Sequence, residues 1–174
     1  MATTLTVGQS KVEVLKERLL SINPSAEVTA LHKTFTSETA DDFDIGSYDY
    51  VVDAIDSLKD KALLILTACQ SKVKLFSSMG AALKMNPSLI KVAEFWKVEG
   101  DPLARSLRRK FKTLGQYPEC KFLCVYSDER QRNKGNQADE RDTSGKRVNG
   151  TVAHITAIFG LTLAGLIIQD ITKG

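Results

Sequence analysis

The sequence predicts an α/β protein in which a mostly parallel sheet is covered by helices on both faces. Short runs of β-favouring residues alternate along the chain with segments whose apolar residues recur at helical spacing. That alternation is typical of parallel strands joined by crossover helices. The length of 174 residues suits one domain with a sizeable core. A composition of 43% hydrophobic and 26% charged residues excludes collagen-like and wholly disordered chains.

The N-terminal part is expected to hold one helix and one short strand. Ser10 and Glu13 have the spacing of a capping box, and the Asn-Pro pair at 23–24 should stop the helix that follows. Residues 27–32 alternate between polar and apolar types, which predicts a short strand. Residues 35–43 carry capping and acidic residues and are expected to form one or two helical turns.

The middle of the chain is expected to supply most of the sheet and two helices. Short apolar runs predict strands at residues 48–55, 73–78, 90–95 and 122–126. Ser57, with Asp60 three residues later, should cap the first of the two helices. Asp101 and Pro102 are typical of the start of the other helix, and Gly115 of its end.

The C-terminal part joins a polar segment to the most apolar stretch of the chain. Residues 127–150 hold six basic and five acidic residues, so we expect a flexible polar loop there. Residues 151–157 are predicted to form the last strand, followed by an apolar helix to about residue 171. Residues 152–168 carry no charge, at the lower limit of a membrane span. Because short apolar runs more often form buried elements, burial is favoured, and membrane contact through the helix stays an alternative.

Cysteine content and charge restrict the classes of function. The three cysteines, Cys69, Cys120 and Cys124, are too few for a disulfide framework and fit a reducing cytoplasm. With only two histidines in the chain, a structural zinc site is not expected. The net charge of +3 does not by itself indicate a nucleic-acid binder. The first residues also lack the basic and apolar regions of a signal peptide.

Two charged residues stand where α/β proteins bind phosphates. Asp56 follows the strand predicted at 48–55, where a carboxylate can hold Mg²⁺ against a nucleotide. The alternative is that it helps Ser57 to cap the helix. Lys11 begins the first helix, a place that disfavours a cation unless an anion is bound there. The alternative is a solvated lysine, and spacing alone favours the structural alternative for both residues.

Basic residues without an intervening acid are concentrated on the helix that follows Asp101. Spacings of three and four residues place a basic set on one helical face: Arg105, Arg108, Arg109 and Lys112. Unbalanced positive charge suits a nucleic-acid backbone, although a solvated face is the commoner explanation. The sequence contains no glycine-rich phosphate loop and no serine-hydrolase or zinc-protease motif.

Several segments, in one order, resemble the ubiquitin-activating-enzyme-like adenylating family of the ThiF, MoeB and HesA types. They are VGQSKVEVLKERLLSINP, YDYVVDAIDSLKDKALLI, LFSSMGAALKMNPSLIKV, GDPLARSLRRKFKTLG and VYSDER, and the likeness resumes over residues 149–168. Within that family, DAIDS, SSMGAALKMNP and GDPLARSLRR most resemble the tRNA threonylcarbamoyladenosine dehydratases. The resemblance covers nearly the whole chain apart from the polar segment.

The resemblance implies a Rossmann-like fold and an enzyme that uses ATP and Mg²⁺ to adenylate a carboxylate. In the dehydratases this is the threonyl carboxylate of the modified tRNA adenosine, which then cyclises with net loss of water. Carried over by position, the resemblance implies that Lys11 and Lys61 bind ATP. It implies that Asp56 is the catalytic aspartate, an ATP-binding residue and the metal ligand. It also implies a homodimer and strengthens the case for tRNA contact by the basic helix.

The sequence departs from the family at its N-terminus. The family's glycine-rich ATP loop, and the acidic residue and Arg- and Asn-containing turn after it, precede the VGxxK stretch, and this sequence lacks them. We therefore expect residues 1–174 to be the C-terminal portion of one adenylating domain, N-terminally truncated relative to the family and inactive alone. One alternative is an adenylyltransferase for a sulfur-carrier or ubiquitin-like protein, with a sulfur-relay or carrier-protein partner. The other is a non-catalytic remnant that binds a partner.

Overall fold

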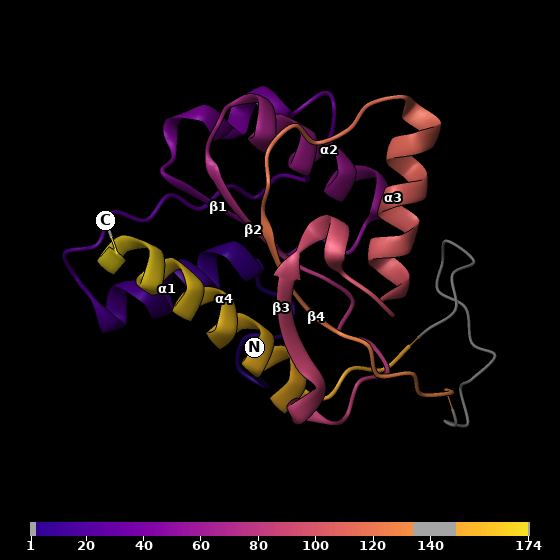
Figure 1. Cartoon of the computed structure of the whole chain (residues 1–174). Coiled ribbons are helices and arrows are strands. Elements are labelled where there is room, and N and C mark those ends of the chain that lie inside the picture. The colour runs from indigo at the N-terminus through magenta and orange to yellow at the C-terminus, as the bar shows by residue number, and fades with distance from the viewer. Residues whose placement is uncertain (1–2, 134–148, 174) are drawn as a thin grey trace. The chain divides into compact units, whose positions relative to one another are not determined.

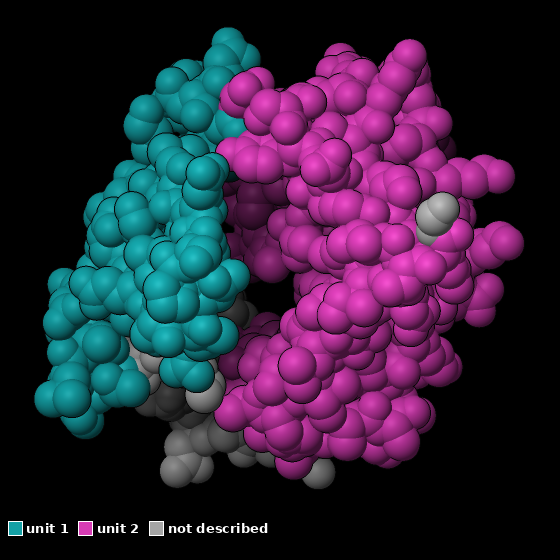
Figure 2. All heavy atoms as spheres, turned by 90° about the vertical axis from the view of Figure 1, so that its left-hand side faces the viewer, with its two compact units in different colours: residues 1–43 teal, residues 44–174 magenta. Residues whose placement is uncertain are grey.

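The computed structural model describes residues 3–133 and 149–173. The chain divides into two compact units, residues 1–43 and 44–174, which Figure 2 colours separately.

The first unit contains the helix α1 (Lys11–Ile22) and the short 3-10 helix η1 (Ala40–Phe43). The helix ends just before the Asn-Pro pair, as predicted, but the Ser10 side chain makes no cap hydrogen bond, so the predicted capping box does not form. The strand predicted at 27–32 is also wrong, because the chain there forms no strand pairing. Alternation of side chains is not enough for a strand, which needs a neighbouring strand for its backbone hydrogen bonds.

A four-stranded sheet forms the centre of the second unit, with strands in the order β1-β2-β4-β3 (Figure 1). The strands are β1 (Tyr50–Asp53), β2 (Lys74–Ser78), β3 (Ile90–Glu94) and β4 (Leu123–Ser127). Neighbours β1 and β2 are parallel, as are β2 and β4, whereas β3 runs antiparallel to β4. The four strands predicted in the middle of the chain are confirmed, and so is the mostly parallel sheet.

Helices cover both faces of this sheet (Figure 1): α2 (Leu58–Gln70) and α3 (Pro102–Leu114) lie on one side, and α4 (Ala153–Lys173) lies on the other. Alternation along β2 explains the two layers, because neighbouring side chains of a strand point to opposite faces. Phe76 packs against Ile155 and Phe159 of α4. The next residue, Ser77, is directed to the opposite face, where α2 lies. Short 3-10 helices complete the unit: η2 (Ile45–Ser47), η3 (Pro87–Leu89) and η4 (Phe95–Lys97).

Both ends of α3 agree with the prediction. Asp101 precedes the helix, and one of its carboxylate oxygens accepts a hydrogen bond of 2.8 Å from the backbone N–H of Ala104. Gly115 follows the helix with a φ of 65°, a left-handed conformation that glycine adopts without strain. The helix therefore begins and ends at signals that are local in the sequence.

The strand predicted at 151–157 is wrong, because these residues lead directly into the long helix α4. Its buried residues, Ile155, Phe159 and Leu163, are spaced four apart and contact the sheet on one helical face. A short apolar run does not by itself distinguish a strand from a buried helix. Here the four-residue spacing of the buried residues is that of a helix. Near the other end of α4, Asp170 accepts a hydrogen bond from the Tyr50 hydroxyl and forms an ion pair with Lys74.

By length and composition α4 could cross a membrane, with a mean hydropathy of 1.7. This is weak support for membrane contact, since core helices meet the same criterion, and one face of α4 packs on the sheet. Of the segment predicted as a flexible loop, residues 134–148 lie outside the described residues.

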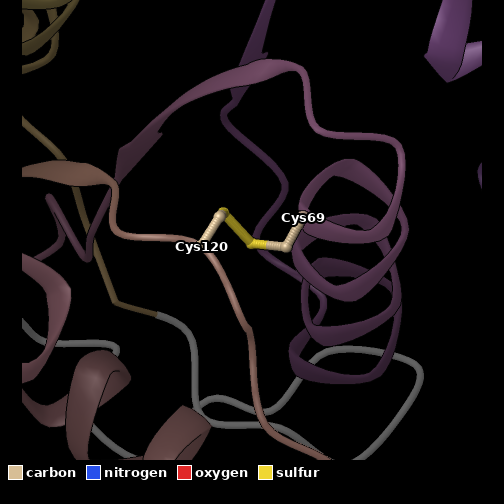
Figure 3. The surroundings of a disulfide bond; sticks show 2 residues. All are labelled: Cys69 and Cys120. Atoms are coloured by element: carbon tan, nitrogen blue, oxygen red, sulfur yellow. A yellow bond between two sulfur atoms is a disulfide. The ribbon is translucent and has the colours of Figure 1, made fainter.

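A disulfide joins Cys69, near the end of α2, to Cys120 in the segment before β4 (Figure 3). This bond departs from the expectation that the three cysteines are reduced. The two cysteines are 51 residues apart in the sequence, and only the fold brings them together. Cys124 is free and buried, and burial raises the pKa of its thiol.

Candidate functional site

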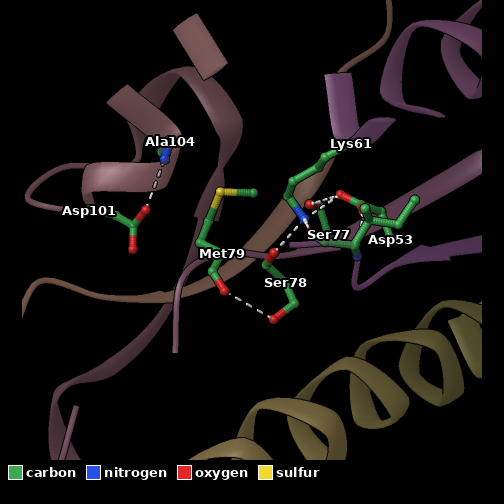
Figure 4. A network of polar contacts seen from close by, with 8 residues as sticks. Asp53, Lys61, Ser77, Ser78, Met79, Asp101 and Ala104 are labelled. Carbon is green, nitrogen blue, oxygen red and sulfur yellow. Dashed lines mark hydrogen bonds and ion pairs between the residues drawn. The ribbon is translucent and has the colours of Figure 1, made fainter. Parts of the chain in front are cut away.

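A buried ion pair stands at the carboxyl ends of β1 and β2 (Figure 4). The Lys61 ammonium lies 2.7 Å from Oδ2 of Asp53, and both side chains are 0% exposed. The Ser77 hydroxyl donates a hydrogen bond of 2.5 Å to the same oxygen. The register of the parallel pair places Asp53 beside Ser77, so strand pairing itself assembles this part of the cluster.

The same cluster fixes the turn that leads to Asp56. The backbone N–H of Ile55 donates to Oδ1 of Asp53 at 3.1 Å, and the Ile55 carbonyl accepts from Lys61 at 3.2 Å. The Lys61 ammonium also donates to the carbonyl of Ser78 at 2.7 Å. With three partners, all three ammonium hydrogens are engaged. The residue after this fixed peptide is Asp56, whose side chain is exposed.

The three residues predicted to bind ATP differ from one another in their surroundings, because two of them are exposed and one is buried. Asp56 stands between β1 and α2, the position predicted for it, and its side chain is exposed. The cap predicted at Ser57 is wrong, because its side chain forms no cap hydrogen bond at the start of α2. Lys61 is buried and fully engaged, so its contacts support a role in positioning the Asp56 turn, and direct contact with ATP stays a prediction. Lys11 begins α1 in the first unit, where its side chain is exposed, and its role also stays a prediction.

Sequence reasoning missed a second polar cluster at the same edge of the sheet. The buried Lys84 ammonium donates to the carbonyls of Ser127 and Glu129, which ties the end of β4 to the segment after β2. The Glu129 carboxylate accepts hydrogen bonds from the backbone N–H groups of Asn86 and Met85, which lower its pKa. Burial lowers the pKa of Lys84. The only sequence signal was a lysine within the apolar stretch AALKM, which is weak.

Asp101 adds a buried carboxylate in which only one of the two oxygens accepts a hydrogen bond from the part of the chain that the structure describes. It is 1% exposed, and among the described residues its Oδ2 has no hydrogen-bond partner. Burial is the main cause that raises the pKa of this carboxyl. A Cβ added at Gly80 would stand 3.7 Å from Oδ2, so the oxygen lies beside the turn that follows β2. A cavity of about 260 Å³ lies beside this turn, lined in part by Gly80, Lys84 and Leu103.

Asp101 makes a pH-dependent contribution to stability that can be measured. The raised pKa means that, as the pH falls from neutral, the folded state takes up a proton here before the unfolded chain does. The wild type should therefore gain free energy of unfolding relative to Asp101→Asn as the pH falls. The gain should occur between the raised pKa of Asp101 in the folded state and the ordinary pKa of an aspartate in the unfolded chain. Asparagine also caps helices, so the cap is kept. Urea denaturation of both proteins across this range checks the prediction, and a difference independent of pH contradicts it.

The structure divides the predicted basic face of α3 into two parts. Arg105, Arg109 and Lys112 are exposed, and none of the ion pairs in the described residues involves them. Arg108 is turned toward the protein, where its guanidinium donates to the carbonyl of Phe95 at 3.1 Å. Its guanidinium carbon also lies 5.8 Å from the centre of the Phe95 ring. The exposed members keep their charge available, and Arg108 mainly anchors the helix.

The side chains at the carboxyl ends of β1 and β2 could bind a magnesium ion together with a phosphate. They fit a magnesium ion bound by protein groups alone less well. Within the described residues no group of three or more His, Cys, Asp or Glu could hold a metal ion. Magnesium in nucleotide sites is bound through one or two carboxylates together with the phosphates and water. The single exposed carboxylate of Asp56 satisfies that requirement.

Comparison with known proteins gives a consistent family relationship. The family model described as the ThiF family matches residues 1–173. A Bacillus subtilis protein named tRNA threonylcarbamoyladenosine dehydratase is 32% identical over 176 residues, which covers 97% of this chain and 68% of the relative. The Haemophilus influenzae protein of the same name is also 32% identical, covering 97% of this chain and 67% of the relative.

Solved structures agree with the sequence relatives. The Escherichia coli tRNA N6-threonylcarbamoyladenosine dehydratase in complex with ATP superimposes with a TM-score of 0.83 at 30% identity, covering 99% of this chain and 68% of that chain. The same enzyme in complex with AMP gives a TM-score of 0.81 at 29% identity, with the same coverage.

Proposed function

Because the chain belongs to the ThiF family, we propose that it carries the adenylating chemistry of a tRNA threonylcarbamoyladenosine dehydratase. The observation that carries this proposal is the agreement of sequence and fold with dehydratases, one of which is known in complex with ATP. The substrate is the threonylcarbamoyl group of a tRNA adenosine. ATP activates its carboxylate as an acyl-adenylate with release of pyrophosphate. The carbamoyl group of the same substrate then attacks the acyl carbon and loses a proton. Cyclisation releases AMP, with net loss of water from the substrate.

In this proposal the residues at the carboxyl end of the sheet have two roles, which are catalysis with metal binding and positioning of the catalytic residue. Asp56 is the catalytic carboxylate and would hold Mg²⁺, which supplies positive charge to the ATP phosphates when it is bound. The buried pair of Lys61 and Asp53 keeps the Asp56 turn rigid, because it holds both the N–H and the carbonyl of Ile55. Preorganised charge of this kind stabilises a transition state without reorganisation during the reaction.

The same proposal assigns the remaining partners. A tRNA substrate needs a cationic surface, and Arg105, Arg109 and Lys112 present one on α3. Lys11 contacts the ATP phosphates, and the chain works as a homodimer in the cytoplasm, where tRNA is available. The proposal also includes membrane contact through α4, which the length and composition of that helix support.

The test compares the chain alone with a chimera. Calorimetric titration of residues 1–174 with ATP and Mg²⁺ should give no detectable binding. The chimera joins to Met1 the N-terminal segment of the Bacillus subtilis relative, where the family resemblance implies a glycine-rich loop. With ATP and tRNA containing threonylcarbamoyladenosine, the chimera should form the cyclic product, detected by mass spectrometry of the nucleosides as the loss of one water.

Three outcomes contradict parts of the proposal. If residues 1–174 alone bind ATP with micromolar affinity, ATP binding does not depend on the added segment, and that part of the proposal is wrong. A folded chimera that binds ATP but leaves the tRNA unchanged overturns the dehydratase assignment. Adenylation of a carrier-protein carboxyl terminus in place of the tRNA favours the sulfur-carrier alternative.

A further inference from the structure

Two exposed aromatic side chains that the proposed chemistry does not use lie in contact beside α3. Trp96 belongs to η4, directly after β3, and is 43% exposed. Tyr117 follows the end of α3 and is 52% exposed. Their ring centres are 6.2 Å apart, although the two residues come from different segments. Large aromatic side chains in contact at a surface are candidates for ligand contact, because their exposure leaves apolar area in water.

The aromatic pair rests on a rigid base. The ring of Trp96 packs edge-on against Phe95 at 5.0 Å between ring centres, and Phe95 is fully buried. Phe95 in turn stacks on Phe122 at 5.0 Å and contacts Phe111 of α3 at 5.9 Å. The Glu94 carboxylate accepts a hydrogen bond from the backbone N–H of Trp96, which fixes the start of η4. The Trp96 ring is therefore held in place by buried side chains, and Tyr117 contacts it from the side of α3.

The same aromatic base is in contact with the cationic helix. Arg108 lies against the Phe95 ring and donates to the Phe95 carbonyl. Lys112 comes one helical turn later on nearly the same line of α3, toward the end of the helix from which Tyr117 follows. Arg109 adjoins Arg108 in the chain, and like Lys112 it is exposed and takes part in none of the ion pairs described. The exposed positive charge therefore lies on the same helix that contacts the aromatic base through Arg108.

We propose that Trp96 and Tyr117 form a stacking platform for an unpaired base of RNA, while Arg109 and Lys112 bind the neighbouring phosphates. This inference rests on the proposed function, which supplies tRNA as the substrate. Proteins bind single-stranded RNA by stacking its bases on aromatic rings and by tracking its phosphates with basic side chains. A duplex keeps its bases stacked on one another, so only unpaired nucleotides offer a free base to the platform.

The chain contains a single tryptophan, so its fluorescence reports on this surface alone. An RNA hairpin with an unpaired loop should quench the Trp96 emission saturably, and a blunt RNA duplex of equal length should quench it far less. Tyr117→Ala should weaken hairpin binding about tenfold, the typical loss for one stacked base. It should leave duplex binding, measured by anisotropy of labelled RNA, unchanged. Arg109→Ala should weaken the binding of both RNAs.

Tyr48→Ala is the matched control, because Tyr48 is 50% exposed but belongs to a different segment of the second unit, just before β1. Circular dichroism verifies that each variant is folded. The platform is wrong if the hairpin leaves the emission unchanged, if the duplex quenches equally, or if Tyr48→Ala weakens binding as much as Tyr117→Ala. An emission change that depends on protein concentration without RNA assigns the surface to contact between copies of the chain and also overturns the proposal.

The binding assay needs neither ATP nor turnover, so the two proposals can fail separately. Selective hairpin binding, together with a folded chimera that binds ATP but leaves the tRNA unchanged, supports the platform and contradicts the dehydratase. A chimera that dehydrates tRNA while Tyr117→Ala changes neither hairpin affinity nor quenching supports the dehydratase and contradicts the platform.

Discussion

Replacing Lys61 with alanine is expected to lower the free energy of unfolding by about 3–5 kcal/mol, the usual loss when one member of a buried ion pair is removed. The substitution leaves the Asp53 carboxylate fully buried with its charge uncompensated. It also frees the carbonyls of Ile55 and Ser78 from their donor. Urea denaturation followed by circular dichroism measures the change.

Lys59→Ala provides the control, because Lys59 is an exposed lysine of the same helix and its loss should cost no more than about 0.5 kcal/mol. The double variant Asp53→Ala with Lys61→Ala removes both charges. It should lose less free energy of unfolding than the single variants Asp53→Ala and Lys61→Ala lose together. A loss for Lys61→Ala as small as that for Lys59→Ala would mean that the buried pair does not hold this part of the fold.

Asp56→Ala in the chimera should reduce the dehydration rate by about 100-fold or more, the scale of loss when a group that stabilises the transition state is removed. Because Asp56 is exposed, and none of the hydrogen bonds or ion pairs found within residues 3–133 and 149–173 involves its side chain, the free energy of unfolding should stay nearly constant. Single-turnover assays with modified tRNA at saturating ATP measure the rate.

The nearby carboxylate of Asp60, in the first turn of α2, serves as the comparison. Asp60→Ala should keep a rate close to that of the unsubstituted chimera. If Asp56→Ala also keeps nearly that rate, the assignment of Asp56 is wrong. If the two variants lose activity equally, the effect belongs to charge near the start of α2 in general.

The strands of the central sheet and the bounds of α3 were predictable because their signals are local. β1 and β2 are short apolar runs, and the ends of α3 carry a capping aspartate and a left-handed glycine. The strand predicted at 27–32 was wrong because pairing depends on a partner strand that alternation cannot supply. The strand predicted at 151–157 was wrong because an apolar run fits a helix equally well until the sheet selects one face of it.

The candidate site was predictable in part. Asp56 could be placed from its position after a strand and before a helix, and its likeness to the family's aspartate added the chemical role. The burial of Lys61 could not be read from the sequence, because its partners Asp53 and Ser78 come from two strands that only the fold aligns. The pairing of Trp96 with Tyr117 and the half-satisfied carboxylate of Asp101 likewise depend on contacts between segments distant in the chain.

The bond between Cys69 and Cys120 closes a covalent ring that encloses β2, β3 and α3. The ring also contains Trp96, Tyr117 and the basic residues of α3, but neither Asp56 nor α4. A protease cut inside the ring would leave the polypeptide in one piece until the bond is reduced. A cut between residue 120 and the start of α4 would break the covalent link to that helix, which only non-covalent contacts, chiefly its packing on the sheet, would then hold in place.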